Sequence, residues 1–174
     1  MKKLIGGLLL IMSTSIYAQE NTLGSAIDDL TYKWDGEARN LNSYEGLSKF
    51  CDDKEYRVEI IDLLNEIHHY DSVLYDRLVA AQRFKKDKEI EKTLDEIAKF
   101  EKKYSMQTFI HFLHEECISR NEIEKHSDES RNDIGANSYD GQIYIIETEL
   151  NKFIKHITKR VDHLRKHVHH MHIK

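Results

Sequence analysis

The chain has 174 residues, with 26 basic and 31 acidic side chains that give a net charge of −5 when the histidines are neutral. It contains no proline and only seven glycines, and no segment alternates apolar and polar residues convincingly. This pattern disfavours a β-sheet fold and predicts an all-α protein. A mature chain of this length corresponds to one domain.

The first 18 residues have the composition of a secretory signal. Lys2 and Lys3 precede an apolar run over residues 4–12, and a more polar stretch ends at the small residue Ala18. This order predicts cleavage after Ala18 and export, either to the periplasm or out of the cell. The apolar run is shorter than the ~20 residues that a membrane-spanning helix needs, so no transmembrane span is expected after cleavage. An uncleaved anchor is the alternative.

Residues 19–42 are predicted to be a loosely structured lead-in, because asparagines and glycines interrupt any helical period. Tyr32 and Trp34 are expected to pin this segment onto the body. A short helix is predicted over residues 43–50, and residues 43–174 are predicted to form a single helical-bundle domain.

The first long helix is predicted over residues 53–84, with Asp52 or Asp53 as its N-cap. Its apolar residues recur at steps of three and four, on one face. Asp71 falls at the centre of this apolar face. A buried carboxylate must be paired or protonated, so we expect Asp71 to contact either Arg165 of the last helix or His68 one turn back.

A second long helix is predicted over residues 89–126, and its apolar face rotates near Ser105. That rotation predicts a bend or a change of packing partner. The last helix, over residues 139–172, has a seam like that of a coiled coil. Three helices with short connections predict an elongated up-down-up bundle, and such a thin body favours a homodimer that buries the ends of the apolar faces.

Cys51 and Cys117 are the only cysteines. If the first two long helices fold back near residue 85, the two cysteines lie at almost the same level. In an oxidising compartment this predicts a disulfide between them. The alternative is two free thiols, with Cys117 packed in the core.

Histidines gather on one side of the last helix: His156, His163, His167 and His170. His163 and His167 are one turn apart, a spacing at which two imidazoles bind one zinc, copper or nickel ion. The alternatives are weak, adventitious metal binding and a solvated polar flank. No cofactor is required by either alternative.

A weaker metal candidate lies on the second long helix and comprises His111, His114 and Glu115, with Cys117 at ligand spacing from His114. Because His111 and His114 lie opposite the apolar face, we expect exposure to solvent rather than metal binding.

The charge is uneven along the chain. From Lys152 onward there are seven basic residues and one acidic residue, whereas the preceding mature chain is strongly acidic. A basic end favours an acidic partner, either a protein or an acidic surface, although basic residues also suit the C-terminal end of a helix. The end lacks the interleaved aromatic residues of a protein that binds single-stranded nucleic acid.

No catalytic nucleophile arrangement, phosphate-binding glycine loop or nucleotide fingerprint occurs, so no enzyme is predicted. The sequence instead predicts an exported binding, adaptor or envelope-stress protein that acts through its basic, histidine-rich last helix. The alternative is a metal-binding protein that buffers or senses zinc, copper or nickel.

Overall fold

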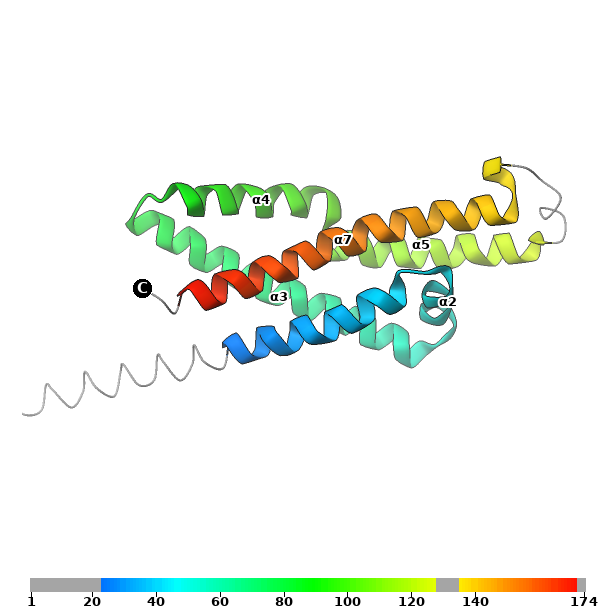
Figure 1. The fold of residues 1–174 in the computed structure, drawn as a ribbon, viewed down its shortest axis with the longest axis horizontal. Coiled ribbons are helices and arrows are strands. Elements are labelled where there is room, and N and C mark those ends of the chain that lie inside the picture. The colour runs from blue at the N-terminus through cyan, green and yellow to red at the C-terminus, as the bar shows by residue number, and fades with distance from the viewer. Residues whose placement is uncertain (1–22, 128–134, 172–174) are drawn as a thin grey trace, which may run out of the picture.

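The computed structural model describes residues 23–127 and 135–171, with side chains described as far as residue 168 (Figure 1). The predicted signal and its cleavage point lie outside the described residues. Within those residues the fold is all-helical and without strands. The elements in chain order are a helix over 23–41, α2 (Tyr44–Asp52), α3 (Lys54–Phe84), α4 (Lys88–Tyr104), α5 (Met106–Lys125), the short 3₁₀ turn η1 (Gly135–Asn137) and α7 (Tyr139–Met171).

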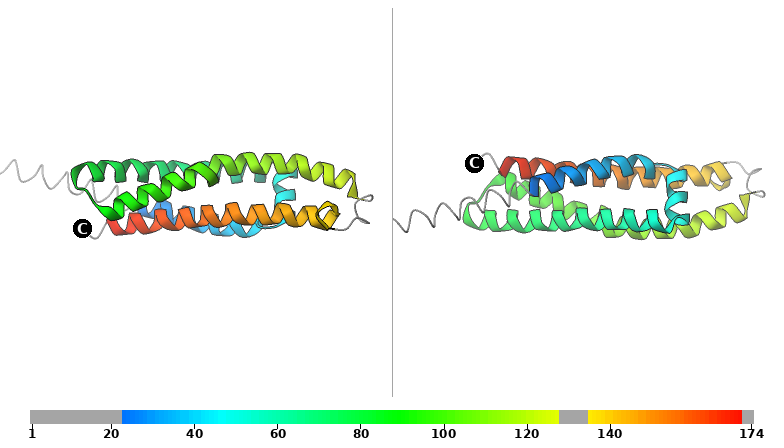
Figure 2. Two further views of the ribbon diagram at one scale, coloured as in Figure 1. Left: turned by 90° about the horizontal axis from the view of Figure 1, so that it is seen from above. Right: turned by 90° about the horizontal axis from the view of Figure 1, so that it is seen from below.

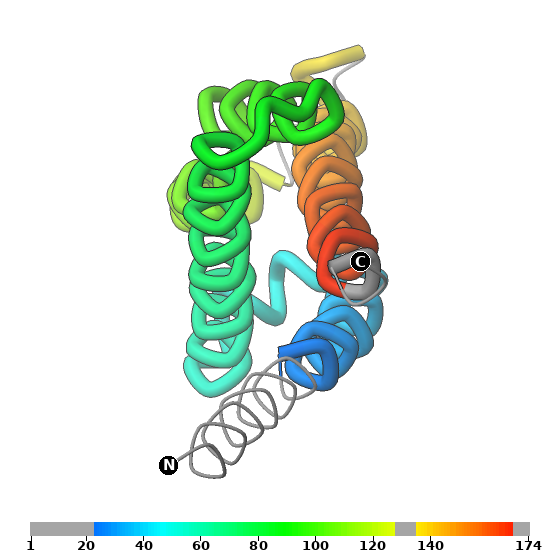
Figure 3. Tube along the Cα trace, turned by 90° about the vertical axis from the view of Figure 1, so that its left-hand side faces the viewer, coloured from blue at the N-terminus to red at the C-terminus, as the bar shows by residue number. Residues whose placement is uncertain are grey.

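The helices form an elongated bundle in which α3 and α7 run one way and the 23–41 helix, α4 and α5 run the other (Figures 1 and 2). In a view down the long axis, α3 and α7 lie apart and α4 bridges them, in contact with both (Figure 3). The short helix α2 runs crosswise between the 23–41 helix and the start of α3. The predicted helical bundle is confirmed, but the three-helix up-down-up arrangement is incomplete, because residues 23–41 add a further arm.

The expectation of a loosely structured lead-in over residues 19–42 is wrong where the structure describes it. Residues 23–41 form a helix whose buried face comprises Ile27, Leu30, Trp34, Ala38 and Leu41. These positions follow steps of three and four, and an interior glycine costs only ~1 kcal/mol, which apolar burial outweighs. Trp34 anchors the segment as predicted, whereas Tyr32 is 84% exposed and does not.

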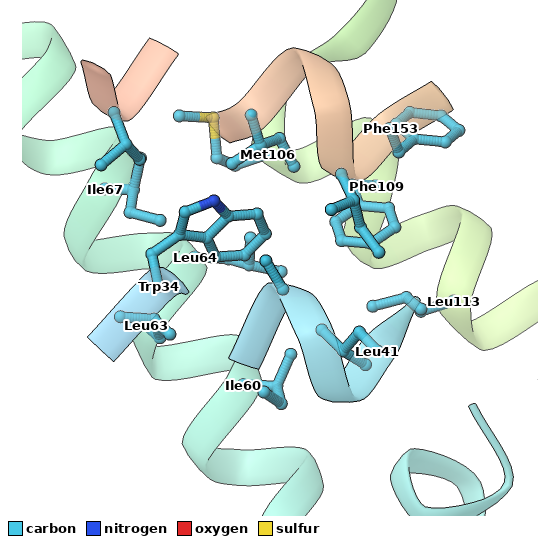
Figure 4. Close-up of a cluster of buried hydrophobic side chains, with 14 of the residues drawn as sticks. Trp34, Leu41, Ile60, Leu63, Leu64, Ile67, Met106, Phe109, Leu113 and Phe153 are labelled. Carbon is cyan, nitrogen blue, oxygen red and sulfur yellow. The ribbon is translucent and has the colours of Figure 1, made fainter. Parts of the chain in front are cut away.

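Trp34 lies within a cluster of buried hydrophobic side chains (Figure 4). Its indole packs among side chains of α3, α5 and α7, of which Leu64, Ile67, Met106 and Phe109 are fully buried or nearly so. The indole N–H also donates to the Thr158 hydroxyl of α7 at 2.9 Å. This core fixes the additional helix against both long arms.

The predicted change near Ser105 is confirmed as a break between α4 and α5. Ser105 adopts an extended conformation, and its hydroxyl accepts a hydrogen bond from the Thr108 backbone N–H at 3.1 Å. It is therefore the N-cap of α5. The break lets α4 lie across α3 and α7 while α5 continues beside the first half of α7 (Figure 2).

The predicted disulfide is present: Cys51 at the end of α2 and Cys117 in α5 are bonded, with their Cα atoms 5.5 Å apart. Beside it, the Arg120 guanidinium donates to both carboxylate oxygens of Asp52 at 2.6 and 2.7 Å. Gly46 permits the close packing at the start of α2, since a Cβ there would lie 1.8 Å from the Asn40 carbonyl oxygen. Together these contacts hold α2 tightly against α5 and the 23–41 helix.

Candidate anion-binding groove

The buried carboxylate predicted on α3 is the base from which the site is built. Asp71 is 2% exposed and accepts a hydrogen bond from the guanidinium of Arg160 on α7, which is 3% exposed. Burial raises the pKa of Asp71, and the Arg160 charge opposes that rise. The pair joins α3 to α7 beneath α4.

The predicted Asp71–Arg165 contact is wrong. Residues five apart on a helix point about 140° away from each other, so Arg160 and Arg165 cannot both face α3. Arg165 instead donates from Nε to Asp28 Oδ1 at 3.2 Å, on the 23–41 helix that the sequence interpretation left unstructured. The other predicted partner, His68, makes no hydrogen bond through its buried Nδ1, although its charge would lower the Asp71 pKa.

Helix α4 covers the buried pair. The Phe100 ring lies against the Arg160 guanidinium, 5.6 Å from ring centroid to Cζ, and Phe100 itself is buried. Stacking of this kind suits arginine because its planar cation is weakly hydrated. The guanidinium therefore has Asp71 on one side and an aromatic ring on another, while its Nε has no hydrogen-bond partner.

Above this pair, α4 and α7 enclose a cavity of about 330 Å³, which we call the basic groove. Its residues are Glu96, Lys99, Phe100, Lys103, Tyr104, His156, Lys159, Arg160 and His163. Four of these side chains are cations and one is a carboxylate. Two lysines come from α4 and lie one helical turn apart, so the charge comes from both walls.

One end of the basic groove is aromatic. The His156 and Tyr104 rings stack with their centroids 3.8 Å apart and their planes 12° from parallel. Tyr104 also meets Phe153 edge-on, which connects this wall to the core. Burial lowers the pKa of His156, and the nearby Lys159 and Lys103 charges lower it further, so the neutral form of the ring is favoured.

The other end of the basic groove holds His163. Its Nδ1 lies 3.7 Å from Glu96 Oε2 but has no hydrogen-bond partner, and its ring meets that of His167 at a centroid distance of 6.4 Å. Burial lowers the pKa of His163, and the Arg160 charge adds to this effect.

The structure does not bring the four histidines of the predicted metal site together among its described side chains. His156 stacks on Tyr104 two turns away from His163, which is ~10 Å along the helix. The His170 side chain lies outside the described residues. No group of three or more histidine, cysteine, aspartate or glutamate residues in the described part of the chain is arranged to hold a metal. The metal hypothesis therefore stays a prediction that rests on His163 and His167.

The weaker cluster on α5 is exposed, as expected. His111, His114 and Glu115 all face solvent, and the His114 ring also packs edge-on against Phe50 of α2, with centroids 5.7 Å apart. Cys117 is bonded to Cys51 and is not free to bind a metal.

A second and larger cavity, of about 900 Å³, lies between the 23–41 helix and α3, and we call it the acidic groove. Six carboxylates border it: Asp35, Glu37, Glu55, Glu59, Asp62 and Glu66. The sequence interpretation missed both grooves. The available signals were the acidic residues that recur every three or four positions in α3, and Lys99 and Lys103 one turn apart in α4.

Comparison with known proteins identifies no relative: no family model matches the chain, and no curated protein or solved structure is significantly similar to it. Within residues 23–127 and 135–171, no helix combines the length and the apolar content needed to cross a bilayer. The functional argument therefore rests on the geometry of the grooves.

Proposed function

We propose that this protein is a non-enzymatic binding protein of the cell envelope or exterior that holds an acidic partner against the basic face of α4 and α7. The observation that carries this proposal is the basic groove, where side chains from two helices place four cations around one cavity. The composition of residues 1–18 supports export.

The physical argument is that three of these cations, the lysines, are not neutralised locally, whereas Arg160 is paired with Asp71. Lys99, Lys103 and Lys159 are exposed, and the one carboxylate of the groove, Glu96, lies beside His163 and within 4.0 Å of Lys92. Several cations around a recess with apolar walls create a positive potential that attracts anions. Lys155 and Lys166 extend the exposed basic face along α7.

The test is co-sedimentation of the mature protein with vesicles of phosphatidylcholine, with and without phosphatidylglycerol. We expect binding only to the anionic vesicles, and we expect it to weaken as salt is added, because exposed charges are screened. The double variant Lys155→Glu/Lys166→Glu should lose most of this binding.

The matched control is Lys33→Glu/Lys54→Glu, which makes the same change of charge at exposed sites on the 23–41 helix and at the start of α3. It should bind like the unaltered protein. Equal binding to neutral and anionic vesicles, or equal loss in the control, would overturn an acidic surface as the partner.

A metal-binding function is the second candidate, because the His163 and His167 rings adjoin one another on α7. Calorimetric titration of zinc into untagged protein tests it. A tight, near-integral stoichiometry that is lost in His163→Ala/His167→Ala would support this function, whereas weak binding at many sites would exclude it.

A further inference from the structure

The basic groove has features that a flat surface contact does not need. Its volume of about 330 Å³ lies at the lower end of the range of small-molecule pockets. Its floor includes the buried Phe100 ring, and one end is closed by the stacked Tyr104 and His156 rings. These walls fit a flat, apolar body rather than a hydrated ion.

A polar group is also prepared at the base of the groove. The Arg160 side chain is 4% exposed, and one of its terminal nitrogens donates a hydrogen bond to Asp71. Its Nε is buried and has no hydrogen-bond partner, as is true of Nδ1 of the nearby His163. Buried donors are ordinarily satisfied, and Arg160, which borders the groove, keeps an unpaired one that an acceptor in the groove would satisfy.

The charges decide the sign of that acceptor. Lys99 and Lys103 on α4, with Lys159 on α7, surround the recess, and Glu96 stands at its far end. A cationic ligand would be repelled by three lysines, whereas an anion would be attracted by them and could accept a hydrogen bond from Arg160.

From these observations we infer that the basic groove binds a small planar aromatic acid, with its ring against Phe100 and the Tyr104–His156 stack and its acid group toward Lys103, Lys159 and Arg160. This inference rests on the proposed function for the choice of groove, and it adds the class of ligand. The acid group is a carboxylate or a sulfonate.

Three probe molecules test separately how the aromatic rings and the negative charge of the ligand contribute to binding. Naphthalene-1-sulfonate has both the aromatic body and the anion, naphthalen-1-ylmethylamine has the same rings with a cation, and methanesulfonate has the anion without rings. In calorimetric titrations of the full mature protein we expect naphthalene-1-sulfonate to bind at one site per chain, and the other two to bind at least about tenfold more weakly. Equal binding of the amine would overturn the inference.

Variants locate the bound probe. Lys159→Glu and Lys103→Glu should each weaken naphthalene-1-sulfonate binding by about tenfold or more. Lys155→Glu, the same change of charge on α7 outside the groove, should leave it unchanged. Tyr104→Ala should weaken binding, whereas Tyr104→Phe, which keeps the ring, should retain it. Equal effects of Lys159→Glu and Lys155→Glu would overturn the inference. As a control for folding, the exposed lysine variants should unfold at the same temperature as the unaltered protein.

The two proposals fail separately. Binding of naphthalene-1-sulfonate that depends on Lys159, together with no binding to anionic vesicles, would retain the aromatic-acid site and remove the acidic surface as partner. Vesicle binding together with no groove-dependent binding of the aromatic acid would do the opposite.

Discussion

Two regions of the bundle, one near the start of α3 and one beyond its middle, are held together by different chemistry. Near the start of α3, the disulfide Cys51–Cys117 joins α2 to α5. About 25 Å further along, the buried pair of Asp71 and Arg160 joins α3 to α7 beneath α4. Both ties lie beside an arginine whose Nε is buried and has no hydrogen-bond partner, Arg120 at the first and Arg160 at the second, but Arg160 also borders the basic groove. The difference teaches that the tie without a covalent bond lies beneath a cavity bordered by lysines, which is the part of the molecule suited to bind an anion.

Breaking the ionic tie should have the largest effect. Asp71→Ala leaves the Arg160 cation buried without its partner, so we expect the free energy of unfolding at neutral pH to fall by about 3–5 kcal/mol. Urea denaturation followed by circular dichroism measures this change.

A double variant distinguishes the loss of the ion pair from the loss of buried side-chain volume. Asp71→Leu/Arg160→Met removes both charges and keeps apolar volume, so its stability should lie close to that of the unaltered protein. If Asp71→Ala alone were equally harmless, the ionic tie would not hold this region together.

Breaking the covalent tie should have the next largest effect. The disulfide spans 66 residues of sequence, and Cys51→Ser/Cys117→Ser should lower the free energy of unfolding by about 2–4 kcal/mol. The same urea denaturation checks this value. Binding of naphthalene-1-sulfonate should survive, because the basic groove lies in the other region, and its loss would show that the two regions are coupled.

Helix caps allow a smaller and matched comparison of the two regions. Asp53 Oδ1 accepts from the backbone N–H groups of Glu55 and Tyr56 at 2.9 and 3.1 Å, and Asp87 Oδ1 accepts from that of Glu89 at 2.8 Å. Asp53→Ala and Asp87→Ala should each cost about 1 kcal/mol. Amide hydrogen exchange should then quicken locally in the first turn of α3 or of α4. Acceleration throughout α3 in Asp87→Ala would contradict separate regions.

Acidification should give the smallest effect, confined to the region of the groove. The folded-state pKa values of His156 and His163 are lowered, so the unfolded chain binds protons first as the pH falls. Their contribution to stability is therefore complete above their unfolded pKa of about 6.5 and is lost as the pH falls through their folded values.

His156→Gln/His163→Gln tests this sign. Thermal unfolding at about pH 7.5 and about pH 5.5 should show a smaller drop in melting temperature for the variant than for the unaltered protein. An equal drop in both proteins would assign the acid sensitivity to other groups.

Local periodicity predicted most of the fold, because burial of one helix face leaves a regular pattern. The helices α3 and α7, the break at Ser105 and the level of the two cysteines all followed from that pattern. The helix over 23–41 was missed because its glycines and asparagines were given more weight than its buried face.

The site was harder to predict than the fold. It depends on how each helix is rotated about its own axis as well as on the height of each residue along the bundle. An error of five residues in the predicted height along α7 assigned Arg165 to Asp71 in place of Arg160. The contact that Arg165 makes with Asp28 was therefore missed. The crossing of α4 over α7, which brings Lys99 and Lys103 toward His156, depends on a change of direction at one serine that sequence spacing locates but does not orient.

Trp34 is also an intrinsic fluorescent probe of the fold. It is the only tryptophan in the chain, its indole is wholly shielded from water, and its N–H is bound to Thr158 of α7. Ultraviolet emission from this one fluorophore therefore reports whether the 23–41 helix is seated on α7, and a shift to longer wavelength would mark its departure. Unfolding of the protein and of its variants can therefore be followed by this intrinsic signal, without a label.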